Sequence, residues 1–352
     1  MINREFASSI KALMPSADHG KRPDSPVSVW KELDRLRGYP EKTAVAIFRT
    51  TGCAWYRFSA CSMCGYFNDI SADVKEEDLM KQVDVIASKL DGEEAIKVFT
   101  SGSFLDPLEF PISARNYFFE TLSGRIDKFL VESRTEYLTD RNLTDLKTFG
   151  NRIRIAIGLE SASDEIVNGS INKGSTFAKY VEAANTAKRL GMEVRTYLLL
   201  KPPFISEKEA IDDVLKSVEL VRPFTTDVSI NPMNIQRNTM VEFLWKKGLY
   251  RPPRLYSVAE VLLRASKMGM EVVSYPTGGD RERGAHNDSP DPMLLRLIVD
   301  SSLEQNFEDL EKYLDSLDLS KYKLELDLES ALFRQMDYSM IQKRISKSSV
   351  TI

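Results

Sequence analysis

The segment RTTGCAWYRFSACSMCGYFND, residues 49–69, contains all three cysteines of this 352-residue chain. They are Cys53, Cys61 and Cys64, and their spacing is C-x7-C-x2-C. The apolar, β-branched run AVAIFRT, which starts at Ala44, comes directly before them and predicts a buried parallel strand. We therefore expect the cysteines on the loop at the carboxyl end of this strand, where β/α barrels carry their active sites.

Further short apolar runs follow this loop and alternate with amphipathic runs. The latter predict helices over residues 79–90 and 211–218, and SEKE (206–209) and SVAE (257–260) resemble capping boxes that open helices. This alternation is typical of an α/β fold, and we predict a partial (β/α)6 barrel. The further predicted strands begin at Ala95, Lys128, Arg152, Met192 and Thr226, with a seventh run at Met270.

Changes in composition divide the chain into three parts. Residues 1–40 mix a short helical pattern with a Pro/Ser/Asp stretch and are expected to form an N-terminal extension. Residues 41–290 form the predicted barrel. Residues 291–352 are charge-rich, with leucines at helical and then alternating spacing, and predict an appended C-terminal module, helical or mixed. Its basic end, residues 341–349, is expected to be frayed.

The overall composition indicates a globular protein, with 42% hydrophobic and 28% charged residues. The sequence has no apolar run of membrane-spanning length and no signal peptide at its start, so we expect a cytoplasmic protein without a membrane partner. A net charge of −4 argues against broad coating of nucleic acid but leaves room for a local basic groove. Only two histidines are present, which disfavours mechanisms that depend on a histidine base.

The cysteine group has three interpretations. Zinc would need a fourth ligand, which Asp69 or the distant His286 would have to supply, although neither is suitably spaced. A four-iron cluster normally takes four cysteines, so three leave one iron open to an external chelator. The plainest alternative is three buried small apolar side chains. The tight grouping after a predicted strand favours the open cluster.

With these features the chain resembles radical S-adenosylmethionine (SAM) enzymes, although its first cysteine gap is longer than their commonest C-x3-C-x2-C spacing. Longer gaps occur in subfamilies that act on tRNA. The resemblance implies a radical-SAM-type barrel, a [4Fe-4S] cluster held by Cys53, Cys61 and Cys64, and SAM as cofactor. In this family SAM chelates the open iron, and an electron from the cluster breaks its sulfonium C–S bond to give a 5′-deoxyadenosyl radical.

The same resemblance suggests residues that contact SAM. Met63 corresponds to a family position near the adenine, and TSGSFLD at residues 100–106 corresponds to a stretch that meets the amino group through its backbone. Strand-end Glu132 and Glu160 correspond to positions near the methionine and ribose groups, and Arg195 is a candidate partner of the SAM carboxylate. Each glutamate has a plainer alternative, a salt bridge to a neighbouring arginine. The candidates in the glycine-containing stretch are Ser101, Gly102 and Ser103.

The second half of the chain narrows the resemblance. The blocks NIQRNT (234–239), LYRPP (249–253) and HN (286–287), together with the cysteine segment, resemble the archaeosine biosynthesis radical SAM lyases called RaSEA. These enzymes are expected to cleave the C–N bond of a lysine adduct of preQ0 at tRNA position 15. The implied partners are tRNA with a modified 7-deazaguanine base, the lysine-adding archaeosine synthase partner and a reductant. Family members often carry further cysteines where this chain has Asp288 and Asp291, so a second metal site is in doubt, and we prefer a solvated acidic loop.

Residues after the sixth predicted strand are candidates for substrate contact. Amide side chains there suit the amidine or the base edges, and basic residues interleaved with aromatic ones over residues 237–256 suit RNA, although an ordinary amphipathic helix explains that segment equally well. The candidates are Asn231, Asn234, Gln236 and Arg237, and, for phosphate or the lysine carboxylate, Arg281 and His286. Alternative functions are another radical SAM tRNA-modifying enzyme, Elp3-like or methylthiotransferase-like, or a non-enzymatic zinc-bearing RNA-binding protein.

Overall fold

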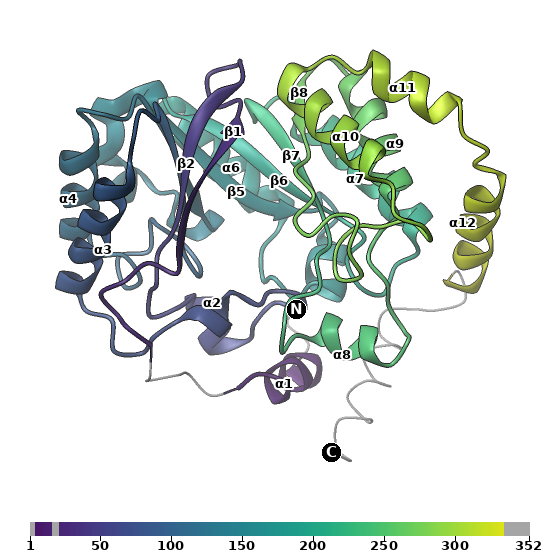
Figure 1. Cartoon of the computed structure of the whole chain (residues 1–352). Coiled ribbons are helices and arrows are strands. Elements are labelled where there is room, and N and C mark those ends of the chain that lie inside the picture. The colour runs from purple at the N-terminus through teal and green to yellow at the C-terminus, as the bar shows by residue number, and fades with distance from the viewer. Residues whose placement is uncertain (1–3, 16–20, 334–352) are drawn as a thin grey trace.

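The computed structural model describes residues 4–15 and 21–333 (Figure 1). Its centre is one eight-stranded sheet in which the strands follow one another in chain order. The first two strands pair antiparallel, and every later pair is parallel, which confirms the predicted α/β partial barrel. The strands are β1 Ser28–Asp34, β2 Glu41–Ile47, β3 Ala95–Phe99, β4 Lys128–Ser133, β5 Ile153–Glu160, β6 Glu193–Leu200, β7 Asp227–Pro232 and β8 Glu271–Val273.

Long amphipathic helices cover the outside of the curved sheet, and their apolar faces join the strands in one large core. The two helical patterns recognised in the sequence correspond to α3 and α7. Helices α3 and α4 lie on the side of β2 and β3, whereas α7 and α9 lie on the side of the last strands (Figure 1). The long helices between strands are α3 Glu76–Lys89, α4 Ile112–Leu122, α6 Phe177–Arg189, α7 Glu207–Val221 and α9 Leu255–Ser266.

Four short helices lie near the carboxyl ends of the strands or in their connections. They are α1 Arg4–Ala12, α2 Ala54–Phe58, α5 Asp140–Leu143 and α8 Met240–Lys246. Figure 1 shows α1, α2 and α8 grouped at one end of the sheet, the end toward which the parallel strands run. The predicted short helix near the N-terminus corresponds to α1, but β1 was not predicted. This edge strand is largely exposed and charged, so its sequence lacks the apolar run of a buried strand.

One of the two predicted capping boxes is present. The Ser206 side chain accepts a hydrogen bond from the backbone N–H of Glu209, whose carboxylate accepts one from the backbone N–H of Ser206. The second prediction is wrong, because α9 begins at Leu255 and buries Ser257 inside its first turn, with Arg254 at the N-cap position. The two prolines at residues 252–253 keep the chain extended until just before the helix, so α9 starts before the serine.

The described part of the C-terminal module is helical, with α10 Pro292–Glu304, α11 Glu308–Asp315 and α12 Ser320–Phe333. Helix α10 packs on α9 and β8, and α12 packs on α7. An ion pair between Lys201 and Glu329 attaches α12 to the loop after β6. The boundary at residue 291 remains a prediction, and residues 341–349 lie outside the described residues. No helix in the described part of the chain has the length and apolarity needed to span a membrane.

Candidate metal centre and its surroundings

The cysteine loop follows β2 and is fixed to the barrel on two sides. Cys53 occupies the N-cap position of α2 without a side-chain capping hydrogen bond, and Cys61 and Cys64 follow this helix. Between them, Ser62 donates its backbone N–H to the Ile171 carbonyl (2.8 Å) and accepts a hydrogen bond from the backbone N–H of Val241 through its own carbonyl (3.3 Å). The loop is therefore held by the segment after β5 and by the start of α8.

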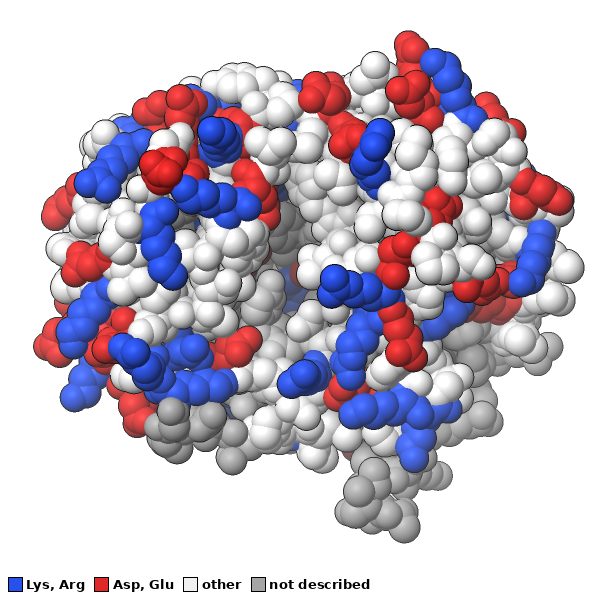
Figure 2. Space-filling view, viewed as in Figure 1, with Lys and Arg blue, Asp and Glu red and all other residues white. Residues whose placement is uncertain are grey.

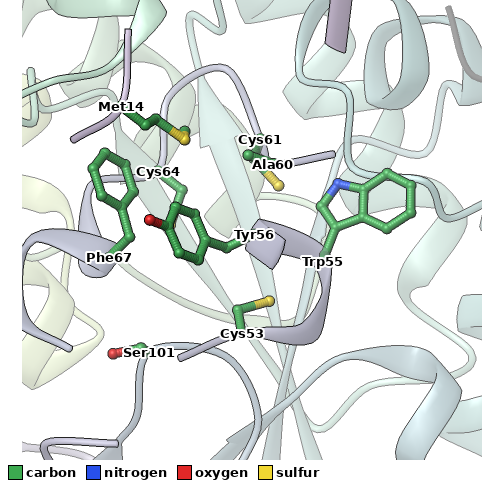
Figure 3. A pocket seen from close by; sticks show the side chains of 9 residues that line it. All are labelled: Met14, Cys53, Trp55, Tyr56, Ala60, Cys61, Cys64, Phe67 and Ser101. Atoms are coloured by element: carbon green, nitrogen blue, oxygen red, sulfur yellow. The ribbon is translucent and has the colours of Figure 1, made fainter. Parts of the chain in front are cut away.

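The three cysteines line one cavity and are free thiols. In Figure 3 the sulfurs of Cys53 and Cys61 point toward the same space, with Trp55 on one side and Tyr56 on the other. Tyr56 stacks on the ring of Phe67 with 5.1 Å between ring centroids, so aromatic side chains wall part of the cavity. The other residues that line it are Met14, Ala60, Cys64 and Ser101.

The geometry distinguishes between the two proposed metals. Within residues 4–15 and 21–333, no three His, Cys, Asp or Glu side chains converge closely enough to hold one metal ion. A four-iron cluster binds each cysteine to a different iron, so it needs thiols that share a cavity without converging on one point. Burial raises the pKa of the Cys61 thiol to about 11, and that of Cys64 still further. A bound cationic centre of either kind would offset this penalty, so it is the separate placement of the thiols that fits a cluster better than a single zinc ion.

The loop after β3 packs directly against the first cysteine. A Cβ atom built on Gly102 would lie 2.6 Å from the Cα of Cys53 and 2.5 Å from a carboxylate oxygen of Glu109. Glu109 accepts hydrogen bonds from the Thr50 hydroxyl and the backbone N–H of Ser103, each 2.7 Å long. This buried carboxylate, which the sequence did not single out, thus fastens the predicted SAM-binding stretch to the end of β2. Burial raises its pKa to about 7.

The two predicted glutamates lie at the ends of neighbouring strands, where the negative charge of Glu160 acts on Glu132. Burial, and next the charge of Glu160, raises the pKa of Glu132 to about 8. Glu160 has a left-handed backbone (φ 70°) at an irregularity in the pairing of β5 with β6, a strained arrangement common at functional sites. Its carboxylate lies 2.6 Å from the ammonium of Lys173. The expected alternative of a salt bridge therefore holds for Glu160, with a lysine in place of an arginine.

Two cations near the cysteines were missed by the sequence reasoning. The charge of Lys173, and next that of Arg134, opposes the burial-driven rise in the pKa of Cys61. Arg134 also donates to the Lys173 carbonyl (3.0 Å), and its guanidinium lies 5.3 Å from the ring centroid of Trp55. Arg134 directly follows β4, and its place at the end of a predicted strand could have marked it as a site residue. Lys173 lies in a connection without a strand pattern, so the sequence offered no such indication.

The structure does not bring Arg195 to the cysteine loop. Its guanidinium is buried and hydrogen-bonded to Asp34 at the end of β1 and to Asp227 at the start of β7. Because β1 runs antiparallel, both carboxylates lie at the end of the sheet opposite the cysteine loop. This position supports a structural role for Arg195 and does not support the predicted contact with the SAM carboxylate.

Met63 lies beside the cysteines, as expected from its place between them. Its side chain packs with Cys61 against a small buried cluster that includes Ile171 and Met233. The cluster joins the cysteine loop to the segment after β5 and to the segment after β7. A contact between Met63 and an adenine remains a prediction.

The predicted substrate residues after β7 fall into two groups. Gln236 and Arg237 reach the cysteine loop, because Gly65 approaches the Gln236 side chain so closely that a Cβ atom would overlap it. Asn68 also donates to the Arg237 carbonyl (2.8 Å). Asn234 accepts a hydrogen bond from the Gln236 side chain (3.3 Å) and donates to the Thr277 carbonyl (2.6 Å), so it links this group to the loop after β8.

The other candidates contact the neighbouring loops. The Asn231 side chain accepts a hydrogen bond from the Ser229 hydroxyl (3.0 Å). Arg281 lies in a turn, where its backbone N–H donates to the Gly278 carbonyl, and the His286 ring lies 2.8 Å from the Gly284 carbonyl. The turn contacts the segment after β7 through Ile235.

The two aspartates at the expected extra cysteine positions have structural partners. Asp288 pairs with Arg254 and with Lys321 of α12, and these hydrogen bonds hold the pKa of its carboxyl down at about 2. Asp291 caps the N-terminus of α10 by accepting from the backbone N–H of Leu294. Both carboxylates thus have partners within the described residues.

Known proteins resemble this chain in sequence and in fold. Residues 47–217 match the family model of the radical SAM superfamily. The chain is 40% identical to archaeosine synthase subunit beta of Methanosarcina acetivorans over 273 residues, 75% of this chain and 79% of that protein. It is 37% identical to the protein of the same name from Thermococcus kodakarensis, over 74% of this chain and 84% of that one. Among solved structures, the archaeal Methanocaldococcus infernus Elp3 with an N-terminal deletion matches with a TM-score of 0.45 at 16% identity, over 56% of this chain and 51% of that chain.

Proposed function

Since the chain belongs to the family of archaeosine synthase subunit beta, within the radical SAM superfamily, we propose that it is the radical SAM lyase of archaeosine formation in tRNA. Its substrate is the lysine adduct of preQ0 at tRNA position 15. The C–N bond between the lysine side chain and its nitrogen is cleaved. The carbon next to the nitrogen loses a hydrogen atom and an electron, which SAM takes up in forming 5′-deoxyadenosine and methionine, and water supplies the oxygen. The amidine thus stays on the base, and the remainder of the lysine leaves as a semialdehyde.

One observation of the structure carries this proposal. Three free cysteines line one cavity, do not converge on a single ion, and lie against the glycine stretch after the next strand. The chain thus takes a [4Fe-4S] cluster and SAM, and the bound cluster supplies the electron that cleaves SAM. Cys53, Cys61 and Cys64 are its ligands in our proposal.

The residues around the cysteines have distinct roles in this proposal. Gly102 and its neighbours Ser101 and Ser103 offer backbone groups to SAM next to Cys53, and Met63 packs near its adenine. Glu132, which is half-buried near the end of β4, contacts the polar part of SAM. Lys173 holds Glu160 in place and, with Arg134, places positive charge beside the thiolates.

The substrate enters from the side of β7. Gln236 and Arg237 lie against the cysteine loop and are the first residues that the modified nucleotide would meet. Asn231, Asn234, Arg281 and His286 are assigned to the same face and remain predictions. A base inside folded tRNA has to be exposed before a barrel can act on it, so contacts to RNA must come from this rim.

A partner and a reductant complete the proposed reaction. The partner is the archaeosine synthase that attaches lysine to the preQ0 base, and the name "subunit" of the relatives agrees with such an association. The reductant supplies the electron to the cluster and is unidentified. We propose that the reaction takes place in the cytoplasm.

The test is an anaerobic assay with defined tRNA. The protein is reconstituted with iron and sulfide, and SAM, dithionite and tRNA carrying the lysine adduct are added. We expect about four irons per chain, 5′-deoxyadenosine, and conversion of the adduct to archaeosine, measured by mass spectrometry of nucleosides. Cleavage of SAM with the adduct left intact would show a radical SAM enzyme that acts on a different substrate. Bound zinc without SAM cleavage would refute the proposal that the protein is a radical SAM enzyme.

A further inference from the structure

A second, larger pocket lies next to the cysteine loop. It has a volume of about 620 Å³ and joins the end of the cysteine loop to the segment after β7. Gly65, directly after Cys64, forms part of its wall, so the pocket begins one residue away from the metal centre. We call it the side pocket. Its remaining lining residues are Lys21, Asn68, Asp69, Ile235, Gln236, Arg237, Asn238 and Arg283.

The side pocket carries an excess of positive charge. Three cations line it, Lys21, Arg237 and Arg283, against the single carboxylate of Asp69. In the part of the chain that the structure describes, the exposed guanidinium of Arg237 has no carboxylate partner among the ion pairs. Figure 2 shows Lys and Arg side chains gathered at the lower edge of the central hollow, over α8 and the loops beside it. An acidic protein thus presents a local basic surface at its site.

Arg283 is only partly neutralised. Its guanidinium lies 2.6 Å from Glu242 of α8, but the same carboxylate also pairs with Lys246 at 3.3 Å. One negative charge is therefore shared between two cations. Arg283 also stacks over Trp245, with 4.8 Å to the ring centroid, which fixes its planar group at the edge of the pocket.

The floor of the pocket is preorganised by amide side chains. Asn68 donates to the Arg237 carbonyl, and Asn238 donates to the side-chain oxygen of Asn68, each at 2.8 Å. Asn238 takes a left-handed backbone (φ 59°), which turns the chain toward α8 and leaves Arg237 exposed at the tip of the turn. The ammonium of Lys21 donates to the Asn68 carbonyl. Few groups would have to be ordered when a ligand binds.

We propose that the side pocket binds one sugar–phosphate unit of the RNA backbone beside the modified nucleotide. The proposal rests on the proposed function and names the part of the substrate that this surface holds. Arginine forks suit phosphate oxygens, and amides suit the ribose 2′-hydroxyl, so both kinds of lining residue have a partner in one nucleotide. With the backbone held here, an extruded base lies within reach of the cysteine cavity, since both share the loop that contains Cys64 and Gly65.

The experiment compares tRNA binding by the wild type and Arg237→Gln at several salt concentrations, without SAM or reductant. Two tRNAs are used, both with preQ0 at position 15 and only one with lysine attached. We expect the variant to bind both tRNAs about five- to tenfold more weakly and the slope of log affinity against log salt to fall by about one counterion. Arg222→Gln is the matched control, because Arg222 follows α7 at the opposite end of the barrel.

Two results would overturn the proposal. Unchanged affinity and slope in Arg237→Gln would show that no phosphate is held there, provided that the variant keeps the iron content of the wild type. Weakened binding of only the lysine-bearing tRNA would instead assign the pocket to the amino-acid end of the adduct. Failure of the proposed function is distinguishable, because it would appear in the wild-type protein as tRNA that binds no better than an unrelated RNA or yields no archaeosine.

Discussion

Replacement of Gly102 by alanine tests whether the contact between two strand-end loops creates the metal site. The new Cβ atom would lie 2.6 Å from the Cα of Cys53 and 2.7 Å from its Cβ. Ordinary contacts of this kind are close to 3.5–4.0 Å, so one loop has to move by about 1 Å. The Cys53 atoms belong to or adjoin the backbone, and Glu109 on the other side is held by two hydrogen bonds, so no flexible side chain can absorb the overlap.

The expected cost follows from this geometry. Overpacking of a well-packed site costs about 1–3 kcal/mol, which the barrel should survive. A shift of about 1 Å at a reacting group lowers rates by roughly a hundredfold. We therefore expect Gly102→Ala to fold, to bind fewer than the about four irons of the wild type, and to form 5′-deoxyadenosine at about one hundredth of the wild-type rate.

The assay measures iron, sulfide, melting temperature and SAM cleavage on the same anaerobic samples. Gly124→Ala is the matched control, because a Cβ atom there meets nothing within 4 Å and the backbone is not left-handed. Full iron content and normal SAM cleavage in Gly102→Ala would refute the inferred packing of this loop on Cys53. A variant that fails to fold would be recognised by its melting curve, and the iron binding of Gly102→Ala would then be measured at lower temperature.

Three further predictions address ligation, charge and pH. Cys64→Ala should lose most of its iron and all SAM cleavage, and elemental analysis that finds unchanged iron would remove this residue from the ligand set. Lys173→Met should lower the unfolding free energy by about 3–5 kcal/mol, because it leaves Glu160 buried without its 2.6 Å partner. Denaturant titration should show that adding Glu160→Gln recovers part of this loss, and simple additivity would contradict the pairing. Burial raises the pKa of Asp213 from 3.8 to about 6, so its contribution to stability is lost as pH rises from about 4 through 6. Asp213→Asn should therefore be more stable than the wild type at pH 7 by at most about 3 kcal/mol but not at pH 4, and a pH-independent difference in melting temperature would disprove this.

The sequence predicted those features that depend on local pattern. Apolar runs such as the one at Ala44 identified the parallel strands, because strands buried on both faces carry no polar alternation. The grouped thiols after β2 indicated the candidate metal centre for a similar reason, since three candidate ligands in one short loop need little tertiary information. The edge strand β1 was missed because its exposed, charged residues resemble a loop.

Residues that act through the tertiary structure could not be predicted in this way. Glu109 and Lys173 lie far from the cysteines in sequence, and only the packing of loops after different strands brings them to the site. Arg195 shows the opposite error. This charged residue on a predicted strand was assigned to SAM, but its position along the strand decides at which end of the barrel it lies. Arg195 lies near the start of β6, where it contacts carboxylates of β1 and β7.

The two ends of the barrel differ in whether their charged side chains have partners within the chain. At the end where the parallel strands begin, the carboxylates of Asp34 and Asp227 share Arg195 in a buried network. Lys97 also pairs with Asp34, and Arg154 with Asp227, so these charges have internal partners. At the cysteine end, desolvation, and next the charge of Glu160, raises the pKa of the half-buried Glu132, and Arg237 has no acidic partner in the ion pairs of the described residues. Groups left without complete internal partners cost stability, and they are placed where a cofactor or a polyanionic substrate can supply the missing charge. Binding at this end therefore gains from interactions that the chain does not provide for itself.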